Sequence, residues 1–158
     1  METEKVCFTR EAALHKAIEM EAASFELYKS AYFLIKDRVA KDLLRDLSLD
    51  ALRHKYILEK AFFEETIQLH ASGVKEGTTM NLTMLLKEKP LDETATAQDV
   101  MIFAIHDKKR AVDFYGKLAE QCADAPMGEM YETLRDDELN HLARLEEVFK
   151  SRYMKEMG

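Results

Sequence analysis

Cysteine, glycine and proline are scarce in this chain of 158 residues, and its apolar runs are short. The two cysteines, Cys7 and Cys122, cannot form a four-cysteine metal module, and they do not suggest a disulfide framework. Cys122 lies among apolar positions, and we interpret it as a small buried hydrophobe. Five glycines and two prolines favour a helix-rich protein, and apolar runs of about five residues are too short to span a membrane.

A surplus of basic residues is also absent, since 23 lysines and arginines stand against 30 aspartates and glutamates, for a formal net charge of −7. This balance argues against a nucleic-acid-binding surface, which needs a basic stripe. The segment 1–5 lacks the basic and apolar regions of a signal peptide. We therefore expect a protein of the reducing cytoplasm, without a nucleic-acid or membrane partner.

Apolar residues recur at steps of three and four in four stretches, and this periodicity predicts four helices. The first two are expected at about residues 9–36 and 38–70. The third begins near Thr96, a suitable N-cap with Asp99 three residues later. The fourth starts after residues 124–126, an acceptable opening with Pro126 in the first turn. Helices of roughly 25–30 residues are about 40 Å long, and four of them form a bundle.

The second and third helices are separated by a long connection, from about residue 71 to 95. Such a length is unusual inside a compact domain. One explanation is a crossover along the bundle, which makes these two helices parallel. The other is an exchange of helical hairpins between two chains. A short helical turn is expected at residues 83–87. The chain is predicted to form a single domain, residues 1–158, with halves at about 9–70 and 96–155.

The two halves repeat each other at an offset of 87 residues. The segment from Ala17 to Tyr28 returns as the segment from Ala104 to Tyr115. Each half carries a version of one pattern, which is an acidic position on its first helix and Glu-x-x-His on its second. The positions related by the shift are Glu21 and Lys108, Ala51 and Glu138, and His54 and His141.

Five ionisable residues fall on the apolar stripes of the expected helices: Glu21, His54, Lys108, Glu138 and His141. Taken singly, a glutamate on such a stripe is often an edge residue that reaches solvent, and a histidine is often a hydrogen-bonded structural residue. Their equivalent positions in two repeats favour a shared interior site, with or without a metal. Glu138 and His141 are three residues apart and share one helix face. Such groups are costly to bury unless they are paired or bound to a metal.

Other polar residues near these positions have weaker claims to the site. Tyr28 and Tyr115 each follow the acidic position of their half by seven residues, so we expect them to point inward. There they either pack in the core or donate a hydrogen bond to an interior carboxylate. Asp50 and Asp137 are expected to face about 100° away from the site. The remaining histidines are assigned no role, and His106 is expected to be solvated; they are His15, His70 and His106.

The chain resembles the ferritin-like superfamily, and within it the rubrerythrin branch. The resemblance is carried by segments 17–28, 47–54, 104–115 and 137–142, and it covers about residues 9–155. In that family a glutamate from each of two helices and Glu-x-x-His from each of the other two bind two irons. The resemblance implies an all-α, ferritin-like four-helix bundle made of two helical hairpins joined by a long crossover. The implied ligand positions are Glu21, Ala51, His54, Lys108, Glu138 and His141.

Two of these six positions depart from the family's pattern. The methyl group of Ala51 cannot bind a metal, and the ammonium of Lys108 cannot do so while it is protonated. The expected metal ligands are Glu21, His54, Glu138 and His141. Two imidazoles and two carboxylates suit one Zn²⁺, Fe²⁺ or Mn²⁺ ion. The expected cofactor is therefore one iron or two, another divalent metal, or none. We hypothesise that Lys108 replaces part of the metal's charge beside buried carboxylates.

The resemblance leaves two functional hypotheses. In the first, the protein binds metal and is linked to iron or peroxide handling, as an oxidoreductase if it is an enzyme. It would then need a separate electron donor, because the chain has no four-cysteine module. In the second, it is a metal-free ferritin-like bundle that acts as a structural or interaction protein. A homodimer is the expected assembly in both cases.

Overall fold

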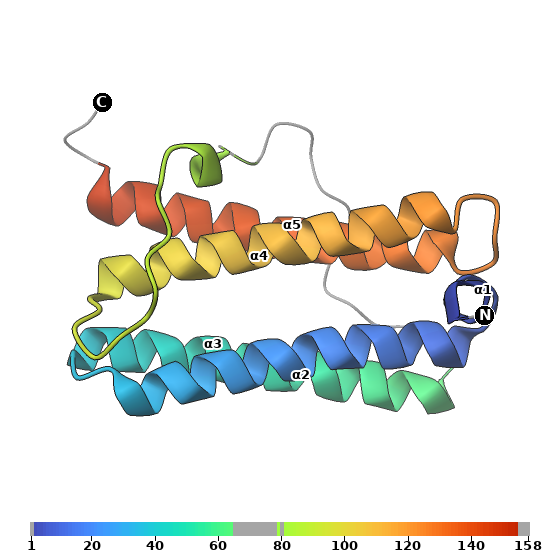
Figure 1. Cartoon of the computed structure of the whole chain (residues 1–158), viewed down its shortest axis with the longest axis horizontal. Coiled ribbons are helices and arrows are strands. Elements are labelled where there is room, and N and C mark those ends of the chain that lie inside the picture. Colours follow the sequence, from blue (N-terminus) through green and yellow to red (C-terminus); the bar gives the residue numbers. More distant parts are fainter. Residues whose placement is uncertain (1, 65–78, 80, 155–158) are drawn as a thin grey trace.

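Four long helices form two antiparallel hairpins that pack side by side in the computed structural model of the chain, which describes residues 2–64, 79 and 81–154 (Figure 1). The described residues form helices, turns and irregular segments, without a strand. The long helices are α2 (Arg10–Leu34), α3 (Arg38–Lys60), α4 (Ala97–Gln121) and α5 (Gly128–Tyr153). The short elements are helix α1 (Glu2–Phe8) and the 3₁₀ turns η1 (Ala61–Phe63) and η2 (Leu82–Met84). The predicted all-α bundle is confirmed.

Side-chain caps fix where three of the long helices begin. Thr9 caps α2 through a hydrogen bond from the backbone N–H of Ala12, and Asp37 caps α3 in the same way. The predicted capping box of Thr96 and Asp99 is present at the start of α4, where each side chain accepts a hydrogen bond from the other residue's backbone N–H.

One predicted helix boundary and the predicted place of one proline were wrong. Helix α3 ends at Lys60 and passes into η1, about ten residues before the expected end; His70 lies outside the described residues. Pro126 does not lie in the first turn of α5, because the chain first makes a tight turn and the helix begins at Gly128. The turn needs a left-handed residue, Asp124, with φ of 66°. The apolar periodicity predicts neither the turn nor the early end of α3.

The two hairpins are connected so that α3 and α4 run in the same direction, as a crossover along the bundle requires (Figure 1). Part of this connection is held against α4 and α5 by polar contacts. Glu146 accepts a hydrogen bond from the backbone N–H of Leu82 at 2.9 Å, within η2. Arg110 makes two hydrogen bonds to Glu88, at 2.9 and 3.0 Å. The expected helical turn at 83–87 is thus present, displaced toward Leu82.

His106 takes part in the same attachment, so the expectation that it is solvated was wrong. Its Nε2 lies 2.7 Å from the backbone oxygen of Leu86, and its side chain is half-buried. The connection covers this flank of α4, and a contact over 20 residues of sequence cannot be read from the helix pattern.

Helix α1 was not predicted, and it packs across one end of the bundle (Figure 1). The backbone N–H of Met127 donates to the oxygen of Cys7 at 3.0 Å, and the Tyr131 hydroxyl donates to the oxygen of Val6 at 2.9 Å. Cys7 and Cys122 form a disulfide across 115 residues of sequence. Cys122 is buried as expected, but it is a half-cystine and not a free thiol. The pairing could not be predicted from the sequence, because it depends on the packing of α1 against the end of α4.

The core is continuous across the two hairpins. Near α1, a cluster of buried side chains draws on all four long helices, including Leu14, Leu58, Tyr115 and Leu134. A second cluster at the opposite end joins Leu44 of α3 to residues of α2 and α4. The interior site lies between these two apolar clusters along the helices. Within the described residues, no helix is long and apolar enough to cross a membrane.

Candidate metal centre

The five ionisable residues singled out in the sequence lie together in the middle of the bundle. Helices α2, α3 and α4 contribute Glu21, His54 and Lys108, which are only 4%, 5% and 8% exposed. Helix α5 contributes both Glu138, which is 3% exposed, and His141, which is half-buried. A helix turn of 3.6 residues places each of them on the face that its apolar neighbours bury.

The imidazoles and carboxylates form two matched pairs. Nδ1 of His54 is 3.7 Å from Oε2 of Glu21, and Nδ1 of His141 is 3.8 Å from Oε2 of Glu138. The two imidazole rings stack, with centroids 4.5 Å apart and planes 3° from parallel. One ligand atom from each of His54, Glu138 and His141 lies within 4.8 Å of the others, which is the arrangement of a possible metal site.

Lys108 lies inside the same cluster, with Nζ 3.2 Å from Oε2 of Glu138. Burial alone would lower the pKa of Lys108, but the negative charges of Glu138 and Glu21 raise it above its usual value, so the ammonium stays protonated. Burial alone would likewise raise the pKa of Glu138, and the neighbouring Lys108 holds it well below its usual range. The two residues therefore form a buried ion pair.

Glu21 and His54 favour their neutral forms. Burial raises the pKa of Glu21, and the adjacent negative charge of Glu138 raises it further, so Glu21 tends to keep its proton. Burial lowers the pKa of His54, and the positive charge of Lys108 adds to this effect. The cluster thus combines one carboxylate, one ammonium, one neutral carboxyl group and a neutral imidazole.

Several polar atoms of this cluster are buried without a hydrogen bond. In the part of the chain that the structure describes, six buried side-chain polar atoms have no hydrogen-bond partner. Four of them belong to the two pairs and a fifth is the hydroxyl of Tyr115; the four are Oε2 of Glu21, Nδ1 of His54, Oε2 of Glu138 and Nδ1 of His141. Oε2 of Glu138 is nevertheless engaged by the ammonium of Lys108 at 3.2 Å, and the other three atoms lie 3.7–3.8 Å from an ionisable partner, so each can still accept or donate a shorter contact.

The comparison with known protein families agrees with this geometry. The family model that matches is Rubrerythrin, and the match covers residues 12–149, from the first turn of α2 to near the end of α5. The chain belongs to the rubrerythrin family. No match is found among the curated proteins or among the solved structures.

In this rubrerythrin-family chain, the two positions that depart from the six-ligand pattern both lie at the site. Ala51 is 2% exposed on α3, one turn before His54, so a methyl group occupies an inward position. Lys108 is 8% exposed on α4, so its side chain also lies inside the bundle. The described residues whose ligand atoms converge closely enough for a metal ion are His54, Glu138 and His141, a smaller set than the six-ligand pattern needs.

The tyrosines expected near the site are buried but do not hydrogen-bond its carboxylates. Tyr28 donates to Oδ2 of Asp107 at 2.7 Å, and the hydroxyl of Tyr115 has no hydrogen-bond partner among the described residues. Asp107 was missed by the sequence interpretation, although it precedes Lys108 and its charge raises the pKa of that lysine. Its contacts with α2, which include Ser24 at 3.5 Å, show that it faces the neighbouring hairpin.

Asp137, which was expected to face about 100° away from the ligand positions, is buried beside His141. It is 6% exposed, and its Oδ1 lies 3.8 Å from Nε2 of His141. At this distance the carboxylate and the imidazole are close neighbours but do not form a hydrogen bond. Its counterpart in the first half, Asp50, is exposed and pairs with Arg53 at 3.0 Å, as its predicted outward direction implies.

The site is reached from solvent between α3 and α5. A pocket of about 160 Å³ is lined there by His54, Lys108 and His141 on its buried side. The exposed residues Arg53 and Arg144 line it on the solvent side.

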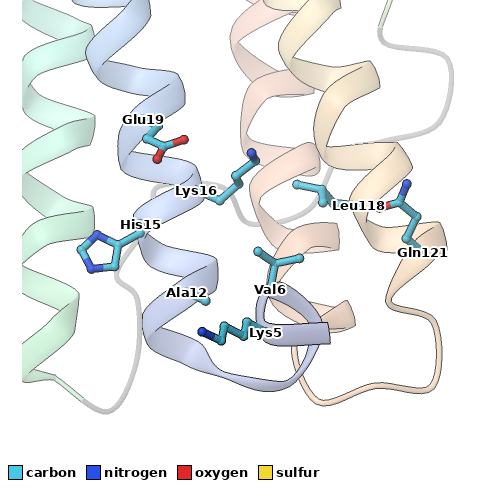
Figure 2. A pocket seen from close by; sticks show the side chains of 8 residues that line it. All are labelled: Lys5, Val6, Ala12, His15, Lys16, Glu19, Leu118 and Gln121. Atoms are coloured by element: carbon cyan, nitrogen blue, oxygen red, sulfur yellow. The ribbon is translucent and has the colours of Figure 1, made fainter. Parts of the chain in front are cut away.

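A larger cleft, of about 350 Å³, lies beside α1 and is separate from the site. Figure 2 shows Lys16 of α2 and Leu118 of α4 reaching toward each other across it, while the ring of His15 turns toward α3. None of the five site residues lines this cleft, so its size does not make it the centre of the chemistry.

Proposed function

We propose that the interior cluster binds one divalent metal ion, with iron as the physiological ion, and that the protein takes part in iron or peroxide handling. The observation that carries the proposal is the convergence of one ligand atom from each of His54, Glu138 and His141, which lie within 4.8 Å of one another in the interior of the bundle. Membership of the rubrerythrin family supports iron as the ion.

The residues that would hold the ion are His54, Glu138 and His141, whose ligand atoms converge, together with Glu21, which lies 3.7 Å from Nδ1 of His54. Lys108 occupies one of the oxygens that the ion would use, so its ammonium must withdraw from Glu138. It can do so because its side chain also lines the pocket between α3 and α5. Glu21 must also lose its proton, so binding releases protons and weakens at acid pH.

A bound iron would supply reversible one-electron redox chemistry. Reduction of a peroxide takes two electrons, so a chain with one such site needs a separate donor. The chain's own cysteines form a disulfide and cannot hold a four-cysteine redox centre. Asp137 lies 3.8 Å from Nε2 of His141 and would favour a protonated nitrogen there, and the apolar clusters on both sides of the site exclude water along the bundle.

Metal content after anaerobic loading tests the proposal. The protein is incubated with Fe(II), desalted, and analysed by mass spectrometry for metal and protein. We expect about one iron per chain, the number that a set of four protein ligands holds. Two irons per chain, or none, would contradict a single-metal centre.

Two histidine variants provide the matched control. His141→Gln should lose the iron, because it removes a ligand that no other residue can supply. His15→Gln should keep it, because His15 is exposed and lies away from the cluster. Equal iron in both variants would show that the metal binds elsewhere.

The metal-free alternative is favoured by one specific contact, the 3.2 Å ion pair between Lys108 and Glu138. In this second hypothesis the ammonium takes over the charge of a metal, and the bundle serves as a structural or interaction protein. Iron content near zero in the loaded protein, together with a strong loss of stability on removal of Lys108, is the result that it requires.

A further inference from the structure

We infer that a small oxyanion, of the size of formate or phosphate, binds in the pocket between α3 and α5 and contacts Arg144 and Lys108. The pocket opens on the proposed metal site and gives that site an anionic ligand or co-substrate. The role of the anion as a ligand or co-substrate rests on the proposed function. The binding of the anion to the pocket needs no metal.

The charges that line the pocket favour an anion. The permanent cations are Arg53, Arg144 and Lys108, and the one carboxylate among the lining residues is Asp50. Asp50 is engaged by Arg53 at 3.0 Å, and Lys108 is paired with Glu138 behind it at 3.2 Å. When both pairs are counted as neutral, the guanidinium of Arg144 remains as an excess positive charge.

Arg144 has no hydrogen bond or ion pair with any other residue that the structure describes. A guanidinium presents a planar set of N–H donors that matches the two oxygens of a carboxylate or phosphate. Lys108 offers the second contact from the buried side, where it is 8% exposed. An anion between the two residues would be held by cations of α4 and α5 at once.

The size and walls of the pocket limit the ligand. A volume of about 160 Å³ is below the roughly 300 Å³ at which pockets for drug-sized ligands begin, so a nucleotide or a sugar phosphate does not fit inside it. Apolar side chains of Leu47, Leu145 and Val148 complete the lining. Apolar walls lower the local dielectric constant and strengthen the attraction between the anion and its cations.

The test measures anion binding to the metal-free protein by calorimetry and by the shift of its melting temperature. Sodium formate and sodium phosphate are titrated separately, and sodium chloride at equal ionic strength is the control for screening. We expect saturable binding of formate, phosphate or both, beyond any effect of chloride. Binding of formate alone identifies a carboxylate site, and binding of phosphate alone identifies a phosphate site. No saturable binding of either anion would overturn the inference.

A pair of arginine variants locates the site. Arg144→Gln should weaken the binding about tenfold or more, as loss of a charge-assisted contact predicts. Arg152→Gln should leave the affinity unchanged, because Arg152 is an exposed arginine of the same helix outside the pocket. Equal affinities in the two variants would also overturn the inference. Iron content is measured separately on loaded protein, so failure of the anion site and failure of the metal site are distinguishable.

Discussion

Glu21 and Glu138 are buried carboxyl groups in one cluster, yet their pKa values move in opposite directions. Lys108 is 3.2 Å from Glu138 and lowers the pKa of that residue. Burial and the neighbouring negative charge of Glu138 instead raise the pKa of Glu21. Two carboxyl groups that share one cation cannot both be charged at low cost. One of them therefore keeps the proton.

Replacement of Glu21 by glutamine should stabilise the metal-free protein at neutral pH. The raised pKa of Glu21 means that the unfolded chain ionises above about pH 4.5 while the folded chain holds the proton, so folding loses stability as the pH rises. Glu21→Gln removes this loss. We expect its melting temperature to exceed that of the parent by a few degrees at pH 7, since ~1 kcal/mol corresponds to about 2–4 °C at this size.

The difference should shrink as the pH falls toward 4, where both states of the parent carry the proton. Glu19→Gln, two residues away and exposed, is the control and should show little change. The quantity to compare is the melting temperature of Glu21→Gln minus that of the parent, measured at pH 7 and at pH 4. A smaller difference at pH 7 than at pH 4 would refute the assignment of the proton to Glu21.

Replacement of Lys108 by methionine should destabilise the metal-free protein. Removal of one partner from a buried ion pair leaves the other uncompensated, at a typical cost of about 3–5 kcal/mol, and protonation of Glu138 limits the loss. Chemical denaturation measures the difference. Lys109→Met is the matched control, because Lys109 is partly exposed and forms a surface ion pair with Asp113 that contributes little. Equal stability of the two variants would show that the ammonium does not neutralise the site.

The turn between α4 and α5 shows how an element boundary depends on close packing. A side-chain carbon added to Gly128 would lie 2.7 Å from the backbone oxygen of Cys122, and Cys122 is itself tied to α1 by the disulfide. Glycine is thus needed at the first residue of α5 because backbone atoms approach it, and not because of its own dihedral freedom. The position of Pro126 misled the sequence interpretation for this reason.

Two glycine variants test this packing. Gly128→Ala should lower the free energy of unfolding by about 1–3 kcal/mol, because the backbone of the turn must move. Gly116→Ala should raise it by about 0.5–1 kcal/mol, because the same methyl group would make an ordinary contact of 3.7 Å with Arg135 inside a helix. Both values come from urea denaturation. Destabilisation by Gly116→Ala and not by Gly128→Ala would show that the described turn is wrong.

The assembly of the two hairpins creates the site, since no single helix carries more than two of its ionisable residues. The offset of 87 residues relates Glu21 to Lys108 and Ala51 to Glu138, so each departure from the six-ligand pattern has an intact counterpart in the other half. Restoring both glutamates should therefore complete the pattern without a change of fold.

The double variant Ala51→Glu with Lys108→Glu should bind two irons per chain after anaerobic loading, because it supplies a glutamate from each of two helices and Glu-x-x-His from each of the other two. The single variant Ala51→Glu keeps the ammonium and should bind fewer. Mass spectrometry of metal and protein gives the count. A double variant that folds but binds no iron would show that the two halves are aligned incorrectly.

Local sequence patterns were sufficient to predict the four long helices, the caps at Thr96 and Asp99, and the five inward-facing residues. Helical periodicity and capping depend on residues within a turn or two of each other, and burial of an apolar stripe carries its polar members inward with it. The repeat then related the two sets of positions across the chain. These features predicted a helical bundle with an interior site, and the resemblance of segments 17–28, 47–54, 104–115 and 137–142 supplied the ferritin-like family.

Contacts between distant residues decided the rest. The disulfide of Cys7, the place of Asp137 beside His141, and the proton on Glu21 depend on which side chains meet when helices pack. The same is true of Arg144, whose role comes from the pocket that α3 and α5 enclose. Packing also sets the dielectric surroundings of each charge, and these surroundings determine pKa values in ways that the order of residues does not record.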